Sequence, residues 1–178
     1  MKKIIKITAI ILLVALIVIQ FIRPAKNNNP AITANDITNT FQINDTIKNI
    51  LSRACYDCHS NNTTYPWYSN MQPVAWWLND HIEEGKHHLN FSEFGSYPLL
   101  RQSKKLKETA NEIDEGEMPL SSYTLIHRNA VLTHDEKEMM MNWAKNLSAE
   151  IYAKVPPEEI EKDKKRREER KRQQEAGK

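Results

Sequence analysis

The sequence predicts an all-α protein. Its 178 residues include only 4 glycines against 8 prolines, and few stretches alternate apolar and polar residues. Sandwiches and barrels need frequent turns and such alternation, so both observations disfavour them. Four segments instead carry apolar residues at the spacing of an amphipathic helix.

The first two predicted helices flank the only cysteines of the chain. The first begins near Asn44 or Asp45, because either side chain can cap a helix, and its apolar face is formed by Ile47, Ile50, Leu51 and Ala54. The second begins after Pro73, a residue favoured in a first turn, and is expected to stop at Gly85.

The third and fourth predicted helices follow a long middle segment. The third starts at Pro98 and is expected to stop at Gly116. In the fourth, Thr133 and Glu136 have the spacing of a capping box, and the apolar face is formed by Met139, Met140, Trp143 and Leu147. Long loops are expected at 60–72, 86–97 and 117–132.

Composition divides the chain into four parts: a signal anchor (1–23), a polar linker (24–40), a domain (41–155) and a charged tail (156–178) that is either helical or disordered. Residues 7–22 are apolar except for Thr8 and Gln20, and lysines precede them. With Ile4 and Ile5 this run approaches the roughly 20 residues that span a bilayer. We therefore expect an uncleaved transmembrane helix with the domain outside the cytoplasm.

The charge distribution argues against a nucleic-acid-binding domain. Residues 27–157 hold eleven basic and sixteen acidic residues, a net charge of −5, so the small positive charge of the whole chain comes from its two ends. A domain that binds nucleic acid should be basic where it binds.

Cys55 and Cys58 are separated by two residues, and His59 follows directly. A thioredoxin-like dithiol needs a preceding strand, whereas a helix is predicted here. A zinc site needs four ligands, and only a distant histidine could complete it. The third possibility is C-x-x-C-H, the attachment signature of c-type haem. Residues at i, i+3 and i+4 share one helix face, so two thiols and an imidazole could meet one porphyrin. With export expected, we favour this third interpretation.

A six-coordinate haem needs a second axial ligand. Met118 is the favoured candidate because it is expected in a loop, where methionine is unusual, and because Pro119 stiffens the chain beside it. The other candidates are Met71, His81, His87, His88, His127, His134 and Met139 to Met141.

The order of these motifs resembles small monohaem cytochromes c. More narrowly, the stretches "CYDCHSNNTTYPWYSNMQPVAWWLNDHIEEGKHHLNFSEF", "EIDEGEMPLSSYTLIH" and "LTHDEKEMMMNWA" resemble the bacterial haem-binding-domain family. The resemblance implies a cytochrome c-like helical domain. It also implies covalent attachment at Cys55 and Cys58, with His59 as proximal and Met118 as distal ligand of the iron.

The function expected from these observations is a membrane-anchored electron carrier with one covalent haem c per chain. Its haem domain would lie on the periplasmic or extracytoplasmic side of the cytoplasmic membrane. The protein would exchange electrons with an unidentified redox partner protein and bind no nucleic acid. Two alternatives remain open. One is a peroxidase-like oxidoreductase subunit, which needs an open sixth position and a distal acid–base residue. The other is a haem-based sensor in which Met118 is displaceable.

Overall fold

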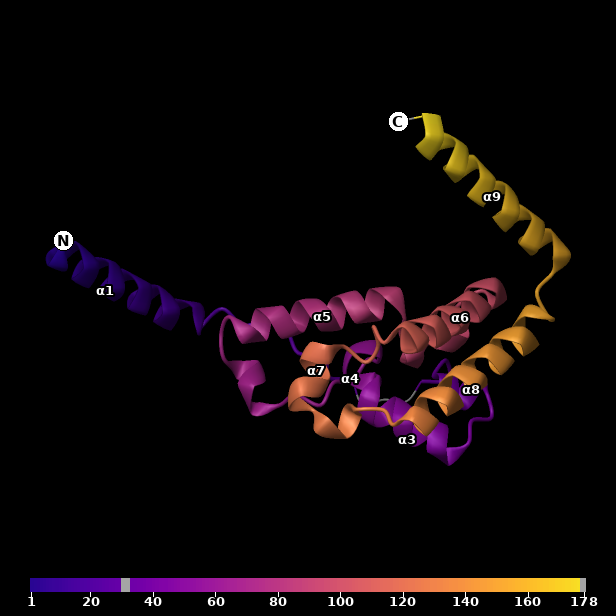
Figure 1. Cartoon of the computed structure of the whole chain (residues 1–178), viewed down its shortest axis with the longest axis horizontal. Coiled ribbons are helices and arrows are strands. Elements are labelled where there is room, and N and C mark those ends of the chain that lie inside the picture. Colours follow the sequence, from indigo (N-terminus) through magenta and orange to yellow (C-terminus); the bar gives the residue numbers. More distant parts are fainter. Residues whose placement is uncertain (30–32, 177–178) are drawn as a thin grey trace.

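The computed structural model describes residues 1–29 and 33–176, and in these ranges the chain forms helices and no strand. Helix α1 (Lys2–Ile19) and helix α9 (Pro157–Ala176) extend away from the domain at the two ends of the chain (Figure 1). The all-α prediction is confirmed. Part of the predicted linker, residues 30–32, and the end of the predicted tail, residues 177–178, lie outside the described residues.

The expected transmembrane helix is wrong. In the described part of the chain, no helix is both long and apolar enough to cross a membrane. The reason lies in α1 itself, which ends at Ile19 and carries Lys2, Lys3 and Lys6 in its first turns. Its charge-free part is only about 20 Å long at 1.5 Å per residue, whereas the hydrocarbon core is about 30 Å thick.

The hydrophobic core lies between helices α3 (Asp45–Ala54), α6 (Leu99–Glu115) and α8 (His134–Tyr152). Helices α6 and α8 pack along each other and are joined by a buried hydrogen bond from Ser148 Oγ to the Ser103 carbonyl, 2.7 Å long. The short helix α2 (Ile37–Thr40) adds Ile37, and the 3-10 helix η2 (Phe91–Ser96) adds Phe91 and Phe94.

Local sequence signals account for most of the helix boundaries. The Asn44 side chain caps α3, and Thr133 and Glu136 form the predicted capping box of α8. Gly116 ends α6 with φ +79°, a conformation that is easy only for glycine. The predicted stop at Gly85 is wrong, since α5 (Val74–His88) continues through it.

The expected loops contain several short helices. These are η1 (Trp67–Asn70), α7 (Ser121–Ile126) and η3 (Arg128–Ala130), together with η2. The described part of the tail is helical as α9 and has no buried residue, but Lys104 of α6 contacts Asp163 of α9 at 2.6 Å. The N-terminal segment is also attached to the domain, because Asn28 forms a bridge with Asn62 and Gln20 is hydrogen bonded to Gln72.

Candidate haem-binding site

The site begins where helix α3 ends. At Cys55 the backbone leaves the α-helical region (φ −125°, ψ −42°), and a new short helix, α4 (Tyr56–His59), follows. The spacing of the motif suggested the last turns of one continuous helix, but the motif instead spans the junction of two helices. Cys58 and His59 still receive the helical repeat locally, because both of their amides donate to the Cys55 carbonyl, at 3.2 and 2.9 Å.

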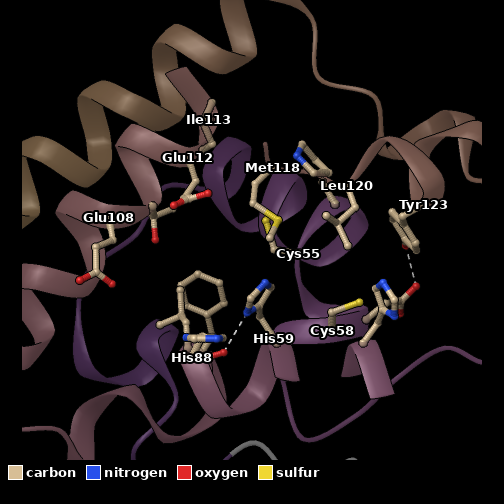
Figure 2. A pocket seen from close by; sticks show the side chains of 18 of the residues that line it. Cys55, Cys58, His59, His88, Glu108, Glu112, Ile113, Met118, Leu120 and Tyr123 are labelled. Atoms are coloured by element: carbon tan, nitrogen blue, oxygen red, sulfur yellow. Dashed lines mark hydrogen bonds between the residues drawn. The ribbon is translucent and has the colours of Figure 1, made fainter. Parts of the chain in front are cut away.

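A cavity of about 440 Å³ adjoins this motif. Ligand pockets in proteins span roughly 300–1,000 Å³. The cavity is enclosed by the motif, by α5 and α6, and by the segment that joins α6 to α7 (Figure 2). Its apolar lining includes Ala54, Leu89, Phe91, Ile113, Leu120, Leu132 and Met140.

All four predicted site residues line this one cavity: Cys55, Cys58, His59 and Met118. Figure 2 shows the His59 ring and the Met118 side chain pointing into the space between them. Met118 is 59 residues away from His59 along the chain, so only the fold brings them together.

The fold places some of the remaining ligand candidates at the cavity and others away from it. His81 and His88 of α5 also line the cavity, and so does Met140, which is fully buried in the core. The described lining does not include Met71, His87, His127, His134, Met139 or Met141.

The His59 imidazole is held in one tautomer. Its Nδ1 lies 2.9 Å from the Leu89 carbonyl oxygen, which can only accept, so Nδ1 carries the proton. Burial lowers the pKa of His59, although the Leu89 hydrogen bond acts in the opposite direction. The neutral ring therefore keeps an unprotonated Nε2, the form in which histidine binds a metal.

Burial keeps both thiols protonated in the protein chain itself. It raises the pKa of Cys55 to about 12 and that of Cys58 to about 11. The two cysteines are free, with no disulfide between them. In the described part of the chain, no group of three or more histidine, cysteine or acidic side chains is placed to hold a metal ion.

Two site residues were not predicted from the sequence. Asp57, between the cysteines, accepts a hydrogen bond from the Tyr123 hydroxyl (2.7 Å, dashed in Figure 2) and another from the Thr64 amide (2.9 Å). Burial, and then the bond to Asp57, raises the pKa of Tyr123, so its hydroxyl remains a donor. The sequence held no signal that these two residues meet.

The polar part of the cavity lining is acidic. Four carboxylates, those of Asp57, Glu84, Glu108 and Glu112, lie in the lining with one lysine, Lys105. That lysine is paired with Glu108 at 2.7 Å. Figure 2 shows Glu108 and Glu112 together on the side of the cavity formed by α6.

Comparison with known families identifies the family of the chain. The family model described as haem-binding domain matches residues 14–146, most of the chain. The chain belongs to the haem-binding-domain family. The family resemblance expected from the sequence is thus confirmed, and the protein binds haem. No curated protein and no solved structure matches the chain.

The described residues fit a haem. The cavity is largely apolar, as a porphyrin face requires, and a neutral imidazole with a free Nε2 projects into it. His59 and Met118 would hold the iron, while Cys55 and Cys58 are placed beside the same space. The haem-binding-domain match extends from residue 14 through the motif to Asn146 in α8, so it covers every one of these residues.

Proposed function

We propose that this haem-binding protein is a monohaem c-type cytochrome that carries electrons. Cys55 and Cys58 would attach the haem through thioether bonds, with His59 and Met118 as axial ligands of the iron. The observation that carries the proposal is that the Cys55–His59 motif and Met118, two segments far apart in the chain, line one cavity. When bound, the haem supplies an iron that alternates between the ferrous and ferric states.

The residues of the chain have separate tasks in this proposal. The Leu89 carbonyl orients the His59 ring, and the apolar lining, including Phe91 and Ile113, keeps water away from the porphyrin. Occupation of both axial positions by His59 and Met118 would leave no site for a substrate. This favours electron transfer over catalysis at the metal.

The partner we propose is a redox protein with a basic surface. Three carboxylates lie beside the cavity, Glu84, Glu108 and Glu112, and the described lining holds one lysine, Lys105. Complementary charge accelerates the encounter of two proteins and suits a transient electron-transfer complex of small interface area. Because thioether attachment of haem takes place outside the cytoplasm, we propose that the domain acts in an extracytoplasmic compartment.

Expression of the full chain together with a cytochrome c maturation system tests the proposal. We expect haem that stays with the protein in acidified organic solvent, and a low-spin ferric spectrum with the weak far-red band of methionine–iron ligation. The ferrous form should not bind carbon monoxide. As a control, a C55S/C58S double variant should release its haem to the solvent.

Three results would contradict the proposal. Extraction of haem from the wild type would rule out covalent attachment. High-spin ferric iron, or rapid binding of carbon monoxide to the wild type, would show an open axial position and favour the oxidoreductase or sensor interpretation. An M118A variant that keeps the wild-type spectrum would exclude Met118 as the axial ligand.

A further inference from the structure

Met118 lies in a connection that is firmly attached at only one of its ends. On the α6 side, the amides of Glu117 and Met118 donate to the Glu112 carbonyl at 2.9 and 3.1 Å, just after the left-handed Gly116. This pattern satisfies the last carbonyls of α6 and fixes the backbone at Met118 itself.

The other end of the connection is α7, which is packed weakly. No residue of α7 is buried, and Leu125 and Ile126 are 65% and 61% exposed. Segments with few buried apolar contacts open locally at low free-energy cost. Within α7, Tyr123 is partly buried and packs against the hydrophobic core. The contacts of this side chain are therefore the ones that keep α7, and with it the Met118 side of the cavity, in place.

Tyr123 supplies these contacts. Its hydroxyl donates to Asp57 Oδ2 in the haem-attachment motif at 2.7 Å, and its ring stacks on His127 with the centroids 4.2 Å apart. His127 is in turn hydrogen bonded to the Tyr68 hydroxyl at 2.6 Å. The Tyr123–Asp57 bond directly joins the helix that follows Met118 to the helix that carries His59.

We propose that Tyr123 and Asp57 are positioning residues that hold Met118 over the haem cavity. The bond between them sets how often Met118 leaves the iron, and hence how well the sixth position is closed. This inference rests on the proposed ligation by His59 and Met118. It goes further by assigning the stability of that ligation to a hydrogen bond 5 residues beyond the ligand.

The geometry of Asp57 makes the bond well suited to this task. Its two carboxylate oxygens have different partners, Oδ1 the Thr64 amide and Oδ2 the Tyr123 hydroxyl. The side chain is therefore already oriented before Tyr123 binds to it. A hydrogen bond to a carboxylate is among the stronger ones in proteins, and its loss shifts an equilibrium by about tenfold or more.

The test is the rate at which cyanide binds to the ferric holoprotein. Cyanide can bind only when the methionine has left, so its rate reports the open population. We expect Y123F to bind cyanide about tenfold faster or more than the wild type, with a weaker far-red band. D57N keeps one side-chain oxygen as acceptor for two donors and should give an intermediate rate.

Y56F is the matched control. Tyr56 lies in the same motif as Asp57, but among the described residues its hydroxyl has no hydrogen-bond partner. Loss of that hydroxyl should leave both the cyanide rate and the far-red band unchanged. Hydrogen exchange of the holoprotein adds an independent readout, because Y123F should accelerate exchange of the 120–127 amides more than exchange in α6 and α8.

The outcomes separate the two proposals. A wild type without the methionine band would refute the His/Met ligation, and the positioning role with it. A wild type with the band, together with a Y123F variant that keeps the wild-type cyanide rate and the wild-type amide exchange of 120–127, would overturn the positioning role alone. If Y123F is broadly destabilised, with equally faster exchange in α6 and α8, and D57N keeps the wild-type rate, the role is likewise refuted.

Discussion

Gly85 of α5 lies directly against the carbonyl oxygen of Cys58. A Cβ atom at position 85 would be 2.7 Å from this oxygen and 3.2 Å from the Cys58 Cβ. Glycine in a helix interior is unfavourable by itself, so its presence in α5 has another cause. Here it allows the helix backbone to approach the Cys55–His59 motif more closely than any other residue would permit.

We expect G85A to destabilise the domain and to reduce haem incorporation. Overpacking costs about 1–3 kcal/mol, and a clash with a backbone oxygen belongs at the upper end because no rotamer change relieves it. The helix-propensity gain of about 1 kcal/mol offsets only part of this. The free energy of unfolding from denaturant titration measures the effect, and D80A, at an exposed position of the same helix, is the control. A G85A variant as stable as D80A would show that the approach is not tight.

Asn27 connects the N-terminal segment to the residues that follow His59. Its side-chain amide donates to the Ser60 carbonyl at 2.8 Å and to Thr63 Oγ1 at 3.0 Å, and its Oδ1 accepts from Lys86 at 2.9 Å. N27A should lower the free energy of unfolding by about 1–3 kcal/mol, because it removes three hydrogen bonds made by partly buried groups. N28A keeps the backbone bridge to Asn62 and serves as the control. Equal stability of the two variants would contradict this role.

Glu136 makes stability depend on pH at the start of α8. The Thr133 amide, and then the Arg53 side chain, donate to its carboxylate and lower its pKa. A lowered folded-state pKa means that the ionised form is favoured by folding. The stabilisation is therefore present above the ordinary pKa and is lost as the pH falls through the lowered one.

E136Q should accordingly be less stable than the wild type at neutral pH by about 0.5–1 kcal/mol, the usual size of a capping or solvent-exposed ionic contribution. The difference should shrink as the solution becomes acidic and Glu136 of the wild type is protonated. Thermal unfolding from pH 7 down to pH 3 measures it, with E150Q at an exposed position of the same helix as control. A difference that stays constant over this range would argue against an ionic origin.

The sequence was sufficient wherever the signal was local. The Asn44 cap, the Thr133–Glu136 capping box and the Gly116 stop are set by residues within a few positions of each other, and so is the attachment motif. Met118 was accessible because a methionine beside a proline in a loop is conspicuous. What the sequence could not supply was the pairing of distant segments.

Gly85 illustrates that limit. As a sequence feature, a glycine at the end of an apolar pattern is typical of a helix stop, and only the close approach of Cys58 reveals its other purpose. The prediction of an N-terminal transmembrane helix was wrong for a related reason. Its apolar run predicted a membrane span, but the length of helix free of Lys2, Lys3 and Lys6 depends on where α1 ends.

Replacement of Met118 by alanine is the most direct test of the proposed distal ligand of the iron. Because Cys55, Cys58 and His59 are unaffected, M118A should retain its haem, lose the far-red methionine band and bind carbon monoxide in the ferrous state. Its reduction potential should fall, since a thioether ligand favours ferrous iron. Absorption spectra and a redox titration measure both effects. M139A is the control, because Met139 lies on α8, is 40% exposed and is not part of the described cavity lining. If M118A and M139A both kept the wild-type spectrum and potential, the distal ligand would have to be sought among the other candidates that line the same cavity, His81 and His88 of α5 and Met140 of α8.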